Sequence, residues 1–132
     1  MKWLKRIFGI SETPAPVNDA SWEFANQVIK IDLTQMPEIA NPGSAVRLEG
    51  KGLPVRTLIV HGQDGDFHAF ANRCTHMGRR IDILPGADRI ECCSVSKSTF
   101  DYGGQPLGGA ARKPLQVFST ALTGTELTVH LT

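Results

Sequence analysis

Two cysteines and a histidine are spaced in this sequence as metal ligands are. One residue separates Cys74 from His76, and Cys93 follows His76 after sixteen intervening residues. Thiolate and imidazole groups are the donors that iron–sulfur clusters use, and two donors one residue apart can reach one metal from a tight loop. Ser96 stands three residues after Cys93, where a further donor would complete a set of four. These residues predict a metal centre built from two loops.

Short strands flank the two loops that would carry these residues. Alternating apolar and polar residues and the turn pair Asp64-Gly65 are typical of antiparallel strands joined by hairpins. The sequence predicts strands at 27–33, 45–50, 55–61, 66–72, 89–92 and 115–131, the last divided at Thr123-Gly124. Two of these strands lead directly to Cys74 and Cys93, so a sheet would position both loops. With 13 Gly and 8 Pro between short strands, the pattern predicts a small all-β sandwich or barrel.

The composition bounds the class of protein. A chain of 132 residues is expected to form one domain with a core large enough to fold without disulfides. Three cysteines, an odd number, argue against a secreted disulfide framework, and ligation through thiolates favours a reducing, cytoplasmic setting. A formal net charge of +1 gives no reason to expect a nucleic-acid partner. The sequence contains no run of 18 apolar residues, so it predicts no membrane-spanning helix.

The first ten residues have a different pattern from the rest. Residues 1–10 predict a short amphipathic helix, which would carry Trp3, Leu4, Ile7 and Phe8 on one face and Lys2, Lys5 and Arg6 on the other. Two interpretations are open: a helix that docks on a partner or an anionic membrane surface, and a terminal segment that covers its own domain. Residues 11–26, which contain two prolines and several small polar residues, predict a linker.

The whole arrangement resembles the Rieske family of iron–sulfur proteins, whose motif is C-x-H, about sixteen residues, then C-x-x-H. Ser98 and Phe100 stand where that family has a serine and an aromatic residue, and Gly104 to Leu115 is similar to its proline-rich loop. The resemblance implies a Rieske-type β-sandwich at 27–132, with a small cluster-binding subdomain formed by loops 74–79 and 93–98. In that family two cysteines hold one iron of a [2Fe–2S] cluster and two histidines hold the other.

The chain departs from the family pattern at several positions. Ser96 replaces the second histidine, Lys97 replaces the glycine that follows it, and Ala110 replaces a loop proline. The extra cysteine pair of some Rieske proteins is absent, because Arg79 and Val95 occupy those positions. The third thiol, Cys92, directly precedes Cys93. Since adjacent strand residues point to opposite faces, Cys92 is expected in the core.

Three interpretations of the site follow. In the first, Cys74, His76, Cys93 and Ser96 hold a [2Fe–2S] cluster beside Ser98, and the serine lowers its reduction potential. In the second, no cluster binds and the fold is an interaction module. The lysine after Ser96 favours this reading, since lysine rarely adopts a left-handed conformation. In the third, the two cysteines and the histidine bind a single iron or zinc ion with water.

The function that the resemblance implies is one-electron transfer to a redox enzyme, either an oxygenase or a reductase. The chain would be a carrier or a subunit rather than a stand-alone catalyst, because oxygenase chemistry needs a separate mononuclear iron domain. The competing class is a cluster-free small subunit of a reductase or oxygenase, with residues 1–10 contacting its partner.

Overall fold

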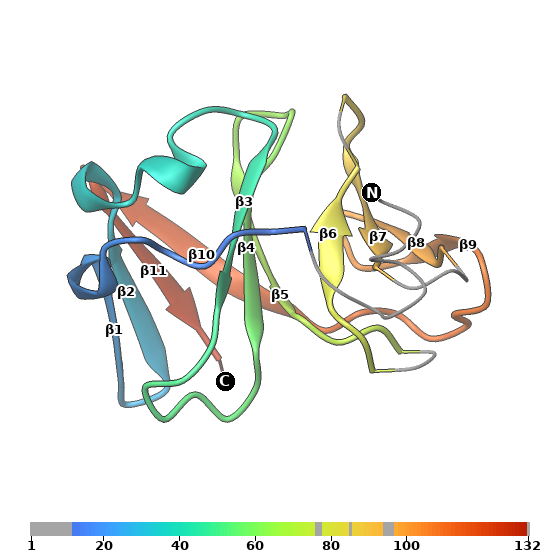
Figure 1. Ribbon diagram of the computed structural model, residues 1–132, viewed down its shortest axis with the longest axis horizontal. Helices are drawn as coiled ribbons and strands as arrows, with labels where there is room; N and C mark the ends of the chain where they lie inside the picture. The colour runs from blue at the N-terminus through green and yellow to red at the C-terminus, as the bar shows by residue number, and fades with distance from the viewer. Residues whose placement is uncertain (1–11, 76–77, 85, 94–96, 132) are drawn as a thin grey trace.

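The computed structural model describes residues 12–75, 78–84, 86–93 and 97–131 (Figure 1). In these residues the chain forms strands and three short 3-10 helices, and no α-helix. The all-β prediction is therefore confirmed. The predicted helix at 1–10 lies outside the described residues. Across the described ranges, no helix is long and apolar enough to cross a membrane.

The strands divide into two antiparallel sheets. The larger sheet has seven strands in the order β1-β2-β11-β10-β5-β4-β3, and the smaller has four in the order β6-β7-β8-β9. The bounds in the larger sheet are β1 Trp22–Ala25, β2 Val28–Asp32, β3 Ser44–Leu48, β4 Thr57–His61, β5 Phe67–Ala71, β10 Val117–Thr123 and β11 Glu126–His130. The bounds in the smaller sheet are β6 Ile81–Ile83, β7 Arg89–Cys92, β8 Thr99–Asp101 and β9 Pro106–Gly108. The 3-10 helices are η1 Asp19–Ser21, η2 Leu33–Gln35 and η3 Pro37–Ile39.

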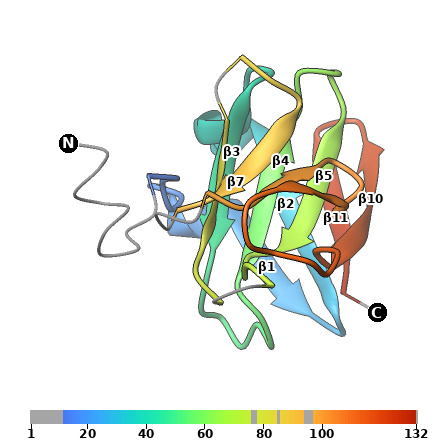
Figure 2. The same ribbon diagram turned by 90° about the vertical axis from the view of Figure 1, so that its right-hand side faces the viewer.

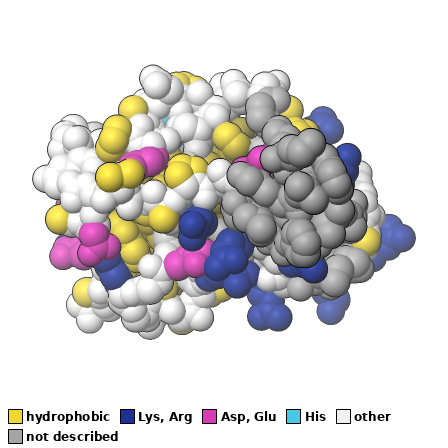
Figure 3. Space-filling view, viewed as in Figure 1, with side chains coloured by type: hydrophobic (Ala, Val, Ile, Leu, Met, Phe, Trp, Pro, Cys, Tyr) yellow, Lys and Arg dark blue, Asp and Glu magenta, His cyan; other side chains and the backbone are white. Residues whose placement is uncertain are grey.

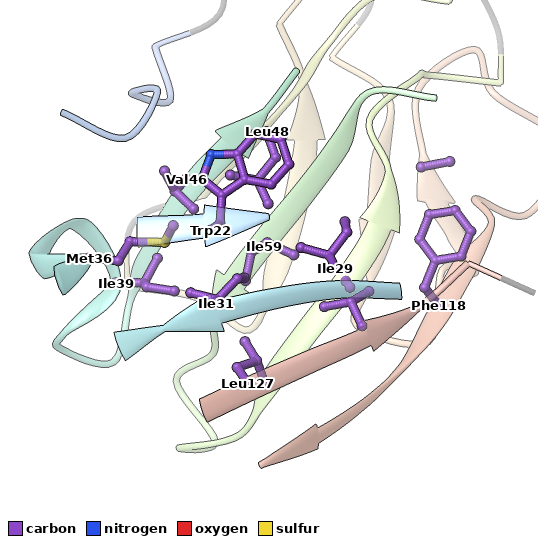
Figure 4. Packing of buried hydrophobic residues seen from close by; sticks show 13 residues of the cluster. Trp22, Ile29, Ile31, Met36, Ile39, Val46, Leu48, Ile59, Phe118 and Leu127 are labelled. Carbon is purple, nitrogen blue, oxygen red and sulfur yellow. The ribbon is translucent and has the colours of Figure 1, made fainter. Parts of the chain in front are cut away.

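The seven-stranded sheet curls, so that strands from its two ends enclose one apolar core. Trp22 on β1 and Val46 and Leu48 on β3 belong to the same buried cluster as Ile31 and Leu127 from the middle of the sheet (Figure 4). On β2 and β11 the buried aliphatic side chains alternate with more exposed residues, which directs them to one face of the sheet. This curled sheet is called the base here.

Strands β3, β4 and β5 are buried on both faces. On β4, Ile59 belongs to the core of the base, while Leu58 and Val60 belong to a second buried cluster. The second cluster lies against the smaller sheet, since it also contains Ile90 and Phe100 of that sheet. The near-continuous apolar run of β4 is explained by this double burial. Figure 1 shows the smaller sheet beside these strands, with β6 nearest to β3 and β4.

Four strands differ from the sequence-based predictions. Residues 22–25, within the predicted linker 11–26, form β1, which pairs along its length with β2. Four residues are too few for a clear period, but burial of Trp22 fixes the strand to the base. The strands β6, β8 and β9 were not predicted, because each has only three residues. The 66–72 strand and its hairpin at Asp64-Gly65 are confirmed, with Gly65 at φ +84°.

Candidate metal centre

The two cysteines proposed as ligands end strands of different sheets. Cys74 follows β5 of the base and Cys93 follows β7 of the smaller sheet, and their exposed fractions are 1% and 2%. Cys74 N–H donates to the carbonyl of Arg79 at 2.7 Å, and Cys93 N–H donates to the carbonyl of Arg80 at 3.0 Å. Both cysteines are thus hydrogen-bonded to one short stretch of backbone. The structure brings the two predicted loops together.

The loop after Cys74 doubles back within five residues. Gly78 N–H donates to the carbonyl of Cys74 at 2.7 Å, and Gly78 has a φ of +72°. A Cβ atom at Gly78 would lie 3.2 Å from the Arg73 side chain as well as in the left-handed region, so a larger residue would be strained there. Glycine at position 78 therefore relieves the backbone where the loop turns back.

Arg56 fastens this loop to the base. Its guanidinium donates to the carbonyl of Asn72 from Nε at 3.2 Å and from Nη2 at 3.1 Å, and Nη2 also donates to the carbonyl of Gly78 at 2.8 Å. One side chain therefore grips the loop on both sides of Cys74. Sequence reasoning missed Arg56, since its type and position carry no metal-ligand pattern. Its place follows from the β4–β5 pairing, in which Asn72 N–H donates to the Arg56 carbonyl at 2.7 Å.

Asn72 and Arg80 hold the other side of the loop. The buried Asn72 accepts the Ile81 N–H on its Oδ1 at 2.6 Å. Arg80 forms a two-bond fork with Glu49, from Nε at 2.7 Å and from Nη2 at 2.9 Å. The hydrogen bond from Arg80 lowers the pKa of Glu49 from its ordinary value of 4.5, and its charge adds to that effect against the opposing influence of burial.

The loop after Cys93 corrects one sequence-based argument. Lys97 has a φ of +51°, so it adopts the left-handed conformation that lysine was expected to avoid, and that expectation had argued against a cluster site. The neighbouring backbone accommodates it, since Cys92 N–H donates to the Ser98 carbonyl at 2.8 Å. Such a residue costs about 1 kcal/mol relative to glycine. Lys97 therefore gives no argument against the family's loop conformation.

Ser98 joins this loop to the glycine- and proline-rich segment that follows. Its buried hydroxyl oxygen accepts the Ala111 N–H at 3.0 Å. A Cβ atom on Gly109 would lie 2.5 Å from the Ser98 Cα, so only glycine permits this approach. Thr75 Oγ1 donates to the Lys113 carbonyl at 2.8 Å and ties the same segment to the first loop. These contacts pack the segment against both cysteine loops, and its residues 106–108 form β9.

Cys92 and Cys93 have different environments. Cys92 is fully buried in the second apolar cluster, with Ile81 opposite it on β6, which confirms its predicted place in the core. Burial raises the pKa of the Cys93 thiol, and the Asp82 carboxylate adds to that rise, while Arg79 and nearby backbone N–H groups oppose it. A metal bound at Cys93 would have to displace the thiol proton.

The donor set suits a thiolate-bound cluster as far as the described residues reach. His76 and Ser96 lie outside them, and among the rest no three His, Cys, Asp or Glu side chains are grouped to hold a metal. Asn72 Nδ2 is buried with no hydrogen-bond partner, and no acceptor for the Ser98 hydroxyl proton occurs within the described ranges. Sulfur atoms of a cluster accept such hydrogen bonds. Two buried thiols and two unused donors fit a [2Fe–2S] group.

Comparisons with known proteins agree with this fit. The model of the Rieske [2Fe-2S] domain family matches residues 31–119. A search of curated proteins found no match. A chain in the complex of reduced oxygenase and oxidized ferredoxin in carbazole 1,9a-dioxygenase is 23% identical, with a TM-score of 0.67 over 81% of this chain and 95% of that one.

Two further solved structures differ in how much of their length is matched. The ferredoxin of carbazole 1,9a-dioxygenase from Nocardioides aromaticivorans IC177 is 20% identical, with a TM-score of 0.62 over 92% of this chain and 100% of that one. The apo form of the quaternary ammonium Rieske monooxygenase CntA is 18% identical, with a TM-score of 0.56 over 73% of this chain and 31% of that one. At identities this low, the structural superpositions show a shared fold and no more. Because the family model matches most of the chain and the two cysteine loops are paired, we conclude that the chain belongs to the Rieske [2Fe-2S] domain family.

Proposed function

We propose that this chain is a one-electron carrier, or the electron-transfer subunit of a redox enzyme, that holds a [2Fe–2S] cluster. Cys74 and Cys93 would bind one iron, and His76 and Ser96 would bind the other. When bound, the cluster supplies a reversible one-electron couple. The observation that carries the proposal is the joining of both cysteine loops through the carbonyl groups of Arg79 and Arg80.

The residues around the cysteines would control hydrogen bonding at the cluster. Ser98 keeps a hydroxyl proton to donate, since its oxygen accepts from Ala111. Hydrogen bonds to cluster sulfur stabilise the reduced, more negative state and raise the potential. Burial of both cysteines excludes water from the thiolate side. Arg56 and Asn72 would fix the Cys74 loop in place whether or not an electron is present.

Ser96, in contrast, would lower the reduction potential of the cluster. An alkoxide adds a negative charge that a neutral imidazole does not, and added negative charge disfavours uptake of an electron. We therefore expect a potential below the roughly −150 to +300 mV of centres with two histidines. Ser96→His is expected to raise the potential into that range, and it would restore a second imidazole whose titration makes the potential depend on pH.

The proposed partner is an oxygenase or a reductase. One similar structure is a complex of an oxygenase and a ferredoxin, and the full length of a second ferredoxin is matched by this chain. The match to the monooxygenase covers 31% of that longer chain. The proposal of a redox-enzyme partner rests on these matches to ferredoxins and to an oxygenase.

The test is the iron and acid-labile sulfide content of protein purified anaerobically after expression with cluster-assembly support. About two iron and about two sulfide per chain are expected. About one iron or zinc without sulfide would replace the proposal with a mononuclear site. Absence of both metal and sulfide would replace it with a cluster-free interaction module. Comparison of Ser96→Ala with wild type then shows whether the serine is the fourth ligand.

A further inference from the structure

The charges of this chain are divided between its two ends. Residues 72–113, which contain the smaller sheet and the cysteine loops, have seven Lys and Arg against four Asp and Glu. The remaining described residues have four Lys and Arg against nine Asp and Glu. Figure 3 shows Lys and Arg gathered toward the right-hand end, where the smaller sheet lies, and Asp and Glu mainly elsewhere. A net charge of +1 conceals this asymmetry.

Four exposed cations lie on the loops of the candidate centre: Arg73, Lys97, Arg112 and Lys113. Within the part of the chain that the structure describes, none of the four forms a salt bridge. Two acidic side chains of the same region are instead used inside the fold. Asp82 accepts the Thr13 hydroxyl at 2.6 Å, and Asp101 accepts the Gln105 N–H at 2.9 Å. Among the described residues, these four positive charges are therefore not paired with an acidic side chain.

Hydrogen bonds between loops place the four cations around one tip. Thr75 on the first cysteine loop donates to the Lys113 carbonyl at 2.8 Å, two residues after Arg73. Ser98, next to Lys97, accepts the Ala111 N–H at 3.0 Å, next to Arg112. Three separate loops thus contribute to a single surface. We call Arg73, Lys97, Arg112 and Lys113 the cationic tip.

A cavity of about 400 Å³ opens beside Arg73. It is lined by Pro54, Val55, Arg56, Arg73 and Gly78. Arg56 uses Nε and Nη2 to hold the carbonyl groups of the cysteine loop. The Arg73 guanidinium has no hydrogen-bond partner among the described residues. Two guanidinium groups at one cavity form a site for a carboxylate.

We propose that the cationic tip is the docking surface for an acidic face of the redox partner, and that a partner carboxylate enters the cavity at Arg73. The identity of the partner as a redox enzyme rests on the proposed function; the acidic character of its face rests on the charges. An acidic partner face attracts the tip and repels the base, so the encounter is oriented with the cysteine loops foremost. Such steering is strongest at low salt, where the Debye length is about 30 Å. It is weak in physiological salt, where the Debye length is about 8 Å.

The test compares two variants that lose the same charge at different places. Arg73→Gln with Lys113→Gln removes one Arg and one Lys from the tip. Lys30→Gln with Arg89→Gln removes one of each from exposed positions on β2 and at the start of β7, where Arg89 is at the opposite end of that strand from Cys92. Lys97→Gln with Arg112→Gln is a second tip variant, in case the first fails to fold. Circular dichroism verifies folding of all three.

The probe is a fluorescein-labelled oligoglutamate peptide of about a dozen residues, with oligolysine of equal length as control. Binding is followed by fluorescence anisotropy at about 10 and 150 mM salt. At low salt, wild type and the control variant are expected to agree within about twofold, and the tip variants to bind at least about fivefold more weakly. Equal weakening in tip and control variants, or equal binding of oligolysine, would overturn the proposal.

Three further ligands distinguish an acidic protein face from other anions and from self-association. Tighter binding of a DNA duplex or of phosphatidylserine vesicles than of oligoglutamate would overturn the assignment to a protein. Salt-sensitive dimerisation in sedimentation velocity, lost in the tip variant, would assign the tip to the base of a second copy and likewise overturn it. Iron and sulfide are measured on the same preparations. Binding of the peptide at the tip in a protein that holds no cluster would uphold the docking surface and refute the proposed electron transfer. A protein that holds a cluster but binds the peptide independently of the tip would refute the docking surface and leave electron transfer standing.

Discussion

The base and the smaller sheet are built by different means. Strands of the base have four to seven residues and enclose an apolar core of their own. Strands of the smaller sheet have three or four residues, and their apolar cluster is shared with β3, β4 and β5. Figure 2 looks onto this end of the molecule, so that the smaller sheet lies toward the viewer and the base lies behind it. The smaller sheet therefore depends on the base for burial of its apolar face.

Hydrogen bonds from the base compensate for the short strands. Arg56 holds the Cys74 loop, and Glu49 holds Arg80 at the end of that loop. Both clamping residues belong to the base and lie outside the loops that they fix. A rigid scaffold that positions loops in this way is the usual arrangement for a functional site. The comparison teaches that the positions of Cys74 and Cys93 are set by residues distant in sequence from both.

The largest effect is expected from the shared apolar cluster. Phe100 on β8 is fully buried within it, so Phe100→Ala should lower the free energy of unfolding by about 3–5 kcal/mol. Urea denaturation followed by circular dichroism measures this loss. Leu107→Ala, on β9 of the same sheet at 50% exposure, is the control and should cost less than about 1 kcal/mol. A similar decrease in the free energy of unfolding for both variants would refute a packed interface between the sheets.

A smaller effect is expected from the clamp. Arg56→Gln should lower the free energy of unfolding by about 2 kcal/mol, because the partly buried carbonyl groups of Asn72 and Gly78 lose a charged donor. Amide hydrogen exchange should quicken at Cys74 and Gly78 and stay unchanged in β2 and β11. Arg56→Lys should recover only part of the stability, since lysine lacks the planar fork. If exchange at Cys74 were unaltered by Arg56→Gln, the clamp would have no role in positioning the loop.

The smallest effect concerns the Glu49–Arg80 pair and depends on pH. The folded pKa of Glu49 lies below its ordinary 4.5, so the pair stabilises the protein above about pH 4.5. That contribution is lost as the pH falls through the folded pKa. At pH 7, Glu49→Gln should cost about 0.5–1 kcal/mol, the range of partly exposed pairs. Melting curves from pH 7 to 3 should show wild type and variant converging in acid.

The control for this titration is Glu23→Gln, which removes one negative charge from an exposed position on β1. Its melting temperature should follow that of wild type at neutral pH. A gap between wild type and Glu49→Gln that widened toward acid would contradict the assigned direction of the pKa shift.

Long periodic strands and turn chemistry were predictable from sequence, whereas the parts that position the site were not. The alternation in β2 and the pair Asp64-Gly65 are local signals, and both elements are confirmed. The strands β6, β8 and β9 form only because the base buries one face of their sheet, which is a long-range effect. The left-handed Lys97 is likewise imposed by surrounding backbone against its own preference.

The ligand pattern was visible from spacing, since Cys74 and Cys93 end strands that the sequence itself indicates. The burial of Cys92 followed from its alternation with Cys93. The roles of Arg56 and Glu49 were invisible, because each depends on the pairing of strands rather than on neighbours in sequence. Asn72, two residues before Cys74, accepts the N–H of Ile81, which lies nine residues further along the chain, so its role could not be read from local sequence either.

The adjacent cysteines give the most direct test of the central claim, that the smaller sheet and the loop of Cys74 hold a cluster. Iron and acid-labile sulfide are measured in Cys92→Ala and Cys93→Ala, purified anaerobically beside wild type. Wild type and Cys92→Ala should each contain about two iron and two sulfide per chain, and Cys93→Ala should lose most of both. Loss of the cluster in Cys92→Ala but not in Cys93→Ala, or no cluster in any of the three proteins, would contradict the account.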